Sequence, residues 1–351
     1  MPLAKRLRKG APIDVKGSDR RVIPVFVPHL GCPHSCAFCN QRSISGSVEA
    51  ANGEKTAGII ERALAESGPG AQVAFYGGSF TAVEPALQEE LLSAVLPFIE
   101  RGDVCSVRVS TRPDCIDAEA LSRLRRGGVG AVEIGAQSMD EDVLIRSSRG
   151  HTAEDVRKAA RAIKSAGFRL VLQMMTGLPG DTREKSVRTA VELAELGPDG
   201  VRIYPTVVVR GTELERLWLS GEYKPQTPDE AAEWCADLLE VFGSYGIPVI
   251  RLGLNPSNEL SGGDALAGAY HPAMGELAQG VFYLRKIEKL LENGRRGDCL
   301  RIRVPEGRAS AVIGQRRRNI RELEARYGFK KVEVIEDKAA RGISLIPGGR
   351  E

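Results

Sequence analysis

Three cysteines, Cys32, Cys36 and Cys39, lie close together near the start of the chain, and Phe38 directly precedes the last of them. Thiolates bind the iron of iron–sulfur clusters, and this spacing lets one tight loop bring three of them to a single four-iron cluster. Three protein ligands would leave one iron open to a small molecule. The alternatives are three buried structural cysteines or a zinc site with His34, although a structural zinc needs four closed ligands. The spacing favours a [4Fe–4S] cluster.

The Cys-x3-Cys-x2-Cys pattern, with an aromatic residue before the last cysteine, resembles the signature of the radical S-adenosylmethionine (radical SAM) superfamily. The resemblance implies that Cys32, Cys36 and Cys39 hold the cluster and that Phe38 lies at the cofactor. In that family the methionyl amino and carboxylate groups of SAM chelate the open iron. An electron from the reduced cluster cleaves SAM, and the resulting 5′-deoxyadenosyl radical abstracts hydrogen from the substrate. An electron donor such as a flavodoxin or a ferredoxin is also implied.

The chain of 351 residues is long enough for two domains. Its apolar share of 42% and its charged share of 27% are those of an ordinary soluble globular protein. No apolar run approaches the roughly 18 residues that span a membrane, and no apolar stretch follows the basic N-terminus, so we expect a cytoplasmic protein without a membrane partner. The other four of the seven cysteines are scattered, which argues against disulfides and against a second cluster.

Short apolar segments alternate with helical patterns from Val22 onward, one of the helices being expected over Glu84 to Glu100. Buried strands joined by helices form parallel sheets with right-handed crossovers. Six such units predict an α/β fold, namely a partial (β/α)6 TIM-type barrel over residues 22–251. Such barrels carry their chemistry on the loops at the carboxyl ends of the strands. The six apolar segments are Val22–Pro28, Val73–Phe75, Val104–Val109, Val129–Ile134, Phe168–Met175 and Gly200–Tyr204.

Gly77, Gly78 and Ser79 directly follow the second predicted strand. Two glycines let backbone groups approach a ligand closely, although a plain tight turn would have the same sequence. At this distance from the cysteine loop, the segment matches the glycine motif of the radical SAM family, which receives the amino group of SAM.

Polar residues at the ends of later strands narrow the resemblance to two groups within the radical SAM superfamily. Gln137 ends the fourth strand and Arg149 follows twelve residues later. In radical SAM enzymes related to oxygen-independent coproporphyrinogen dehydrogenase and to the elongator catalytic subunit, a Gln at the first position contacts the cofactor. An Arg at the second position binds the carboxylate of the cofactor. A surface arginine is the alternative for Arg149, and His151 is expected to start a helix. Gln173 stands where the coproporphyrinogen enzymes usually carry Asp, and Ser110 stands where the elongator family usually has Glu.

The most specific resemblance is to the elongator catalytic subunit. It rests on Val201–Leu214 and on Ser110–Asp114, and it covers roughly residues 22–250 with about six motifs in the same order. The glycine-rich acyl-CoA loop of that family is not found in this sequence, and neither are the residues that precede its barrel and help to bind tRNA.

The sequence pattern after the predicted barrel differs from the alternating strands and helices before it. We expect a linker and helical connection over residues 252–297, mainly helical from Gly262 to Glu292 and broken near Pro272. Residues 298–351 predict a strand, two short helices and another strand, an order that resembles the core of a KH domain. KH domains clamp about four nucleotides against a Gly-x-x-Gly loop. From Arg285 to Lys331 there are 15 Lys and Arg against 6 Asp and Glu.

The candidate RNA-binding residues form the loop between the two short helices: Gly314, Gln315, Arg316, Arg317 and Arg318. Arg317 replaces the second glycine of the KH pattern, so the loop gains charge for phosphates but loses the close backbone approach that glycine allows. A small basic domain used for structure or dimerisation is the alternative. At the other end of the chain, residues 1–21 are expected to form a basic, mobile arm.

These features together predict a radical SAM enzyme that modifies a base of RNA, in particular of tRNA. Two alternatives remain: a radical SAM oxidase or transferase acting on a small metabolite, and an RNA-binding protein whose cluster is structural or redox-sensing. A methylthiotransferase is disfavoured, because it would need a second set of cluster cysteines.

Overall fold

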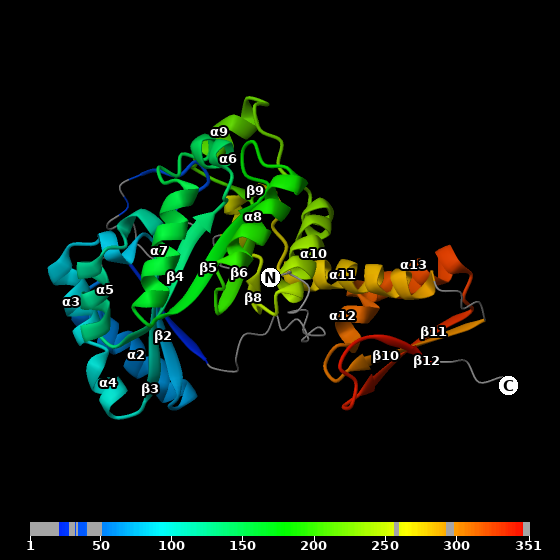
Figure 1. Cartoon of the computed structure of the whole chain (residues 1–351), viewed down its shortest axis with the longest axis horizontal. Coiled ribbons are helices and arrows are strands. Elements are labelled where there is room, and N and C mark those ends of the chain that lie inside the picture. Colours follow the sequence, from blue (N-terminus) through cyan, green and yellow to red (C-terminus); the bar gives the residue numbers. More distant parts are fainter. Residues whose placement is uncertain are drawn as a thin grey trace, which may run out of the picture.

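The computed structural model describes residues 21–27, 32, 34–40, 51–255, 260–292 and 298–346. The predicted N-terminal arm lies outside these residues, apart from Arg21. Figure 1 shows a larger body that holds the main sheet and a smaller C-terminal body, with helix α11 (Met274–Leu291) running between them.

A sheet of seven parallel strands forms the centre of the larger body, in the order β1-β2-β3-β4-β5-β6-β8. It curls into a half-barrel, which confirms the predicted α/β partial barrel and adds β8 to the six strands expected. The strands are β1 (Val22–Phe26), β2 (Ala71–Tyr76), β3 (Val104–Thr111), β4 (Val129–Gln137), β5 (Arg169–Thr176), β6 (Gly200–Pro205) and β8 (Val249–Leu252).

Helices connect the successive strands: α2 (Gly53–Ser67), α3 (Pro85–Ser93), α4 (Leu96–Glu100), α5 (Ala118–Arg126), α6 (Glu141–Arg146), α7 (Ala153–Ser165), α8 (Arg183–Glu195), α9 (Glu213–Leu219) and α10 (Pro228–Ser244). The single helix expected over Glu84 to Glu100 is wrong, because the chain forms α3 and α4 instead. Pro97 has no N–H to donate to the carbonyl of Ser93, and its ring would clash there, so one helix cannot continue through it.

The strands carry different side chains on their two faces. Alternate residues such as Val107, Val109 and Val132 belong to the hydrophobic core shared with the helices. The residues between them point to the other face, since successive side chains of a strand alternate. Arg108 and Glu133 are such residues, so the concave face of the sheet carries buried charges.

The segment after β8 packs back onto the larger body. Strand β9 (Ala265–Gly268) pairs antiparallel with β7 (Val207–Val209), and α11 packs along α10. The prediction of helix from Gly262 onward is therefore wrong at residues 265–268, although the helix after Pro272 is present. Gly268 makes the pairing possible, because its φ is 97° and a Cβ there would lie 2.8 Å from the carbonyl oxygen of Thr206.

The C-terminal body has the predicted order of elements. Strand β10 (Cys299–Pro305) is followed by α12 (Ala309–Ile313), α13 (Arg318–Tyr327), β11 (Lys331–Asp337) and β12 (Ser344–Ile346). Strand β10 lies between β11, to which it is parallel, and β12, to which it is antiparallel. The KH-like assignment stays a prediction.

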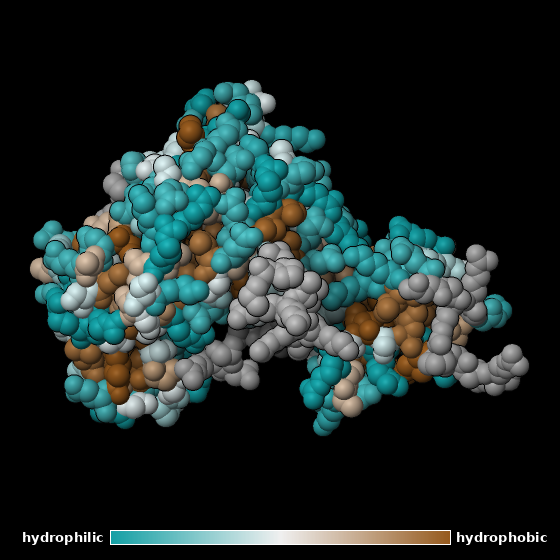
Figure 2. Space-filling view, viewed as in Figure 1, coloured by the Kyte–Doolittle hydropathy of each residue, from teal (hydrophilic) through white to brown (hydrophobic). Residues whose placement is uncertain are grey.

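Hydrophilic residues cover most of the face shown in Figure 2, and hydrophobic residues occur there in separate areas. Among the described residues, none of the helices has both the length and the apolar character needed to cross a membrane.

Candidate functional site

The cysteine loop is held from two sides by backbone hydrogen bonds. The N–H of Ala37 donates to the carbonyl oxygen of Ser147 after α6 (3.1 Å), and its own carbonyl oxygen accepts from the N–H of Leu214 in α9 (2.7 Å). Phe38 is half-buried and packs against two small clusters, one around Leu178 and one around Tyr223. The loop is thus fixed to the rim of the barrel at its centre.

The three thiols of the loop are half-buried, and none forms a disulfide. No three Cys, His, Asp or Glu side chains within the described ranges are grouped closely enough to hold a metal ion between them. Burial and the neighbouring Cys36 raise the pKa of the Cys32 thiol, while the guanidinium groups of Arg112 and Arg149 act in the opposite direction. These two arginines therefore favour the thiolate form, which is the form that binds metal.

Arg149 joins the cysteine loop to the sheet. One of its terminal nitrogens lies 3.0 Å from Sγ of Cys36, and the other donates to the carbonyl oxygen of Gly135 at 2.8 Å. The residue is 6% exposed, so the alternative of a surface arginine is wrong. Its Nε is buried and has no hydrogen-bond partner among the described residues. An unused buried donor of this kind is costly unless a ligand accepts from it.

Arg112 supports Arg149 and was not singled out by the sequence. It forms a bidentate ion pair with Asp114, both contacts being 2.9 Å, and it donates to the backbone carbonyl oxygen of Arg149 at 2.6 Å. The sequence signals for it were its place directly after β3, at the carboxyl end of a strand, and its position inside the Ser110–Asp114 motif.

Gln137 and Gln173 meet at the ends of neighbouring strands. Nε2 of Gln173 donates to Oε1 of Gln137 at 2.9 Å, and the reverse contact is 3.4 Å. Gln137 has a φ of 65°, which is unusual for a residue other than glycine, and such backbone conformations cluster at functional sites. A Cβ at Gly135 would lie 2.7 Å from Nε2 of Gln137 and 3.5 Å from Arg149, so the small residue there lets both side chains converge.

The remaining predicted cofactor residues lie nearby but differ in their surroundings. Gly77 and Gly78 follow β2 with φ values of 82° and 88°. The Ser79 hydroxyl is fully buried and is already engaged with Oγ1 of Thr111 (2.9 Å) and the N–H of Arg112 (3.2 Å). The Ser110 hydroxyl is also buried but has no partner within the described part of the chain. Of the two serines, Ser110 is thus the one with an unused hydrogen-bonding group.

A buried polar layer on the concave face was not predicted. Nε of Arg202 lies 3.1 Å from Oε2 of Glu133, and Nε of Arg108 lies 3.8 Å from the same oxygen. Arg202 also donates to the hydroxyl groups of Tyr76 and Tyr204, both at 2.9 Å. Burial lowers the pKa of Arg202, but the Glu133 carboxylate together with Tyr204 and Tyr76 outweighs this effect, so the pKa is raised. The sequence did contain a signal for this layer, because polar residues stand two positions apart in β3 and in β6 and so point to the same face of the sheet.

His151 directly precedes Thr152, the N-cap of α7, so it lies next to the helix start and is not itself the first helical residue. Its Nε2 lies 3.2 Å from the carbonyl oxygen of Ala136, and Thr152 after it forms a capping box with Asp155. Burial lowers the pKa of His151 to about 4, with the nearby Arg149 adding to the effect, so its ring is neutral at pH 7.

Four of the five candidate RNA-binding residues, Gly314 to Arg317, lie between α12 and α13, and Arg318 is the first residue of α13. Arg316 and Arg317 are exposed, have φ values of 51° and 61°, and form no ion pair with other described residues. Arg318 differs from them, because it pairs with Asp229 of α10 at 2.6 Å. Gly314 packs towards α11, where a Cβ on Gly280 would lie 3.8 Å from its Cα.

Comparison with known proteins gives matches over most of the chain. Residues 26–193 match the model of the radical SAM superfamily, and residues 198–282 match that of the radical SAM C-terminal domain. A tRNA uridine(34) acetyltransferase of Methanocaldococcus jannaschii is 37% identical over 128 residues, which is 36% of this chain and 24% of that protein. Human Elongator complex protein 3 is 38% identical over 136 residues, which is 38% of this chain and 25% of that protein.

A third relative, an uncharacterised protein of M. jannaschii, is 30% identical over 236 residues, which is 64% of this chain and 72% of that protein. Among solved structures, the archaeal Elongator complex protein 3 of Methanocaldococcus infernus without residues 1–46 has a TM-score of 0.59 at 23% identity, over 80% of this chain and 64% of that one. That likeness concerns the fold. The matched part is about a quarter of the acetyltransferase and of the human protein. The two consecutive family matches and the shared fold establish that the chain belongs to the radical SAM superfamily, whose enzymes use a [4Fe–4S] cluster and S-adenosylmethionine.

Proposed function

We propose that this radical SAM enzyme modifies a base of RNA, in the first instance of tRNA, and that its C-terminal body holds the RNA. The observation that carries the catalytic part is the position of Arg149, which contacts Cys36 and Gly135 and keeps one buried donor unused. The RNA part is supported by the exposed Arg316 and Arg317, and by relatives whose names include a tRNA-modifying enzyme.

Cys32, Cys36 and Cys39 would hold the cluster. The donor set fits, since three thiols on one anchored loop match a cluster with one open iron. Positive charge from Arg112 and Arg149 stabilises the thiolates, and the N–H···S contact from Arg149 to Cys36 would tune the cluster's reduction potential.

Arg149, Gln137, Gln173 and Ser110 would hold SAM, together with the turn at Gly77 and Gly78. The unused Nε of Arg149 suits a carboxylate, because guanidinium–carboxylate hydrogen bonds are charge-assisted and strong. The two glutamine amides and the free Ser110 hydroxyl offer further polar contacts. Ser79 is proposed as a support of the turn rather than a contact, since its hydroxyl already bonds to Thr111.

When bound, the reduced cluster and SAM supply a carbon-centred radical that can abstract hydrogen from a substrate. The protein's own part is to position the cofactor and the substrate and to shield the reactive intermediate from water. Phe38, Met175 and Leu178 pack together beside the loop, and the buried ion pair of Arg202 with Glu133 lies on the concave face of the sheet. Such walls exclude water from a reactive intermediate.

Gly135→Ala tests the proposed SAM contacts. The new Cβ would meet the end of the Gln137 side chain at 2.7 Å, so we expect the fold to persist and the free energy of SAM binding to weaken by about 0.5 to 1.5 kcal/mol, the net value of one lost hydrogen bond. Isothermal calorimetry with SAM measures the change. Gly130→Ala in the same strand is the matched control, because its Cβ would meet no atom closer than 3.9 Å. Equal affinities of the two variants would show that Gln137 and Arg149 do not contact SAM.

The RNA substrate is tested by mass spectrometry of nucleosides from the tRNA of cells with and without the gene. We expect one modified nucleoside to disappear and its unmodified precursor to accumulate. Purified protein with SAM and a reductant should then convert tRNA from the deficient cells. An unchanged nucleoside profile, with 5′-deoxyadenosine still formed when a small metabolite is added, would refute the RNA substrate and favour the metabolite enzyme.

A further inference from the structure

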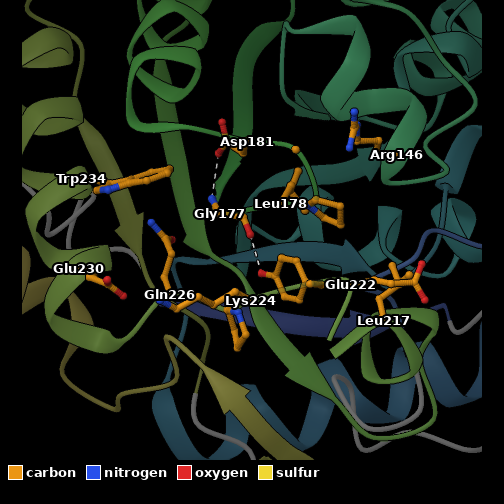
Figure 3. A pocket seen from close by; sticks show the side chains of 14 residues that line it. Arg146, Gly177, Leu178, Asp181, Leu217, Glu222, Lys224, Gln226, Glu230 and Trp234 are labelled. Carbon is orange, nitrogen blue, oxygen red and sulfur yellow. Dashed lines mark hydrogen bonds between the residues drawn. The ribbon is translucent and has the colours of Figure 1, made fainter. Parts of the chain in front are cut away.

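A pocket of about 520 Å³ lies outside the barrel interior, next to the cysteine loop. Its walls come from the turn after β5, the end of α6, α9 and the first turns of α10. Figure 3 shows Trp234 and Gln226 on one side of it and Arg146 and Glu222 on the other. None of the proposed cluster or SAM residues lines it, so it is a separate site.

Several charged side chains of the pocket are already paired within the protein. Arg146 pairs with Asp142, and Glu222 bonds to Arg216 and Ser220. Glu230 caps α10 through its bonds to Thr227. These groups are therefore not the ones that a ligand would meet first.

Four groups are left to meet a ligand. Lys224 is exposed and has no ion pair with any other described residue, and the half-buried Trp234 offers its indole ring. Gln226 is 9% exposed, and its Nε2 has no hydrogen-bond partner among the described residues, although its Oε1 accepts from Thr176 at 3.3 Å. Asp181 uses Oδ2 for the N–H of Gly177 (2.8 Å) and the hydroxyl of Ser186 (2.7 Å), but Oδ1 has no such partner.

These four groups match the parts of a nucleotide. An indole ring stacks on any base, and base–aromatic stacking is a main contribution to single-strand binding. An amide N–H and a carboxylate oxygen that line one pocket offer a donor and an acceptor for a base edge that carries a carbonyl oxygen and an N–H. The ammonium group of Lys224 at the mouth suits a phosphate.

The position of the pocket connects the two parts of the proposed function. Leu178 and Tyr223 of its wall pack in the same clusters as Phe38 of the cysteine loop. On the other side, Glu230 and Trp234 belong to the same two turns of α10 as Asp229, which holds Arg318 at 2.6 Å. The pocket and the arginine loop are thus separated by about one helix diameter, roughly 10–12 Å.

We propose that this pocket binds one nucleotide of the RNA whose neighbouring nucleotides lie on the Arg316–Arg317 loop. The base stacks on Trp234, its edge bonds to Gln226 and Asp181, and its phosphate meets Lys224. The proposal rests on the proposed RNA substrate. It adds a second place where the protein contacts the RNA, between the C-terminal body and the cysteine loop.

Tryptophan fluorescence tests it, since the chain has two tryptophans and Trp218→Phe leaves Trp234 alone. The probe is a single-stranded RNA of about eight nucleotides, which allows about four for a KH-like module and leaves the others for α10 and the pocket. We expect binding to quench the fluorescence of Trp234. In a separate binding assay, Trp234→Ala should weaken affinity about 5- to 150-fold, the range for one lost base–aromatic stack, and Trp234→Phe should recover part of it.

Tyr245→Ala is the matched control, because it removes an exposed aromatic ring from the other end of α10 and should leave affinity unchanged. RNA binding could depend on Arg316 and Arg317 but neither quench Trp234 nor respond to Trp234→Ala. That result would refute the pocket as a nucleotide site and would still be consistent with an RNA-modifying enzyme. Quenching by uridine or adenosine monophosphate without any binding of the longer RNA would identify a free nucleotide as the ligand. That outcome would refute the RNA substrate together with this inference.

Discussion

Cys36→Ala is expected to abolish both iron loading and SAM cleavage. Removing one of three thiolates leaves two protein ligands for a cluster that needs three, and it also removes the sulfur that Arg149 contacts at 3.0 Å. Anaerobic reconstitution of the unaltered protein should load about four irons per chain. Iron analysis and chromatography of 5′-deoxyadenosine after reduction with dithionite measure the two losses.

Cys299→Ala is the matched control, since it removes an exposed thiol in β10 of the C-terminal body. We expect that variant to keep its iron and its cleavage rate. Full SAM cleavage by Cys36→Ala, or tight binding of zinc in place of iron by the unaltered protein, would contradict the assignment of the cluster to this loop.

Replacing both Arg316 and Arg317 by alanine is expected to weaken tRNA binding and to flatten its salt dependence. Each lost phosphate contact should lower the slope of log affinity against log salt concentration by about one, so the double variant should lose about two. Arg318 is left out of the variant because its guanidinium group pairs with Asp229 and is not free for phosphate. Filter binding across a series of salt concentrations measures the slope.

Arg318→Ala serves as the comparison for this experiment, and its slope should change less than that of the double variant. Slow SAM cleavage without substrate should persist in both variants, because the proposed cluster and SAM residues lie in the barrel. Undetectable tRNA binding by the unaltered protein at low salt, or a slope that ignores Arg316 and Arg317, would count against the C-terminal body as the RNA-holding part.

Local patterns were sufficient to predict the architecture of the barrel. A helix or strand is specified mainly by residues a few positions apart, so the short apolar segments located β1 to β6, and local patterns also gave the order of elements in the C-terminal body. One error came from a contact distant in sequence, the pairing of β9 with β7, which turned an expected helix into a strand. The other had a local cause, because Pro97 prevents a single helix over Glu84 to Glu100.

The sequence by itself determined the family chemistry, because three thiols at this spacing can reach one cluster without help from any distant residue. The tertiary structure decided which groups remain available. It engaged the Ser79 hydroxyl and left that of Ser110 unused, it paired Arg318 with Asp229 and left Arg316 and Arg317 exposed, and it gathered Trp234, Gln226 and Asp181 around one pocket. Whether a polar group is free depends on partners that folding brings from far along the chain. Spacing within one segment contains no information about them.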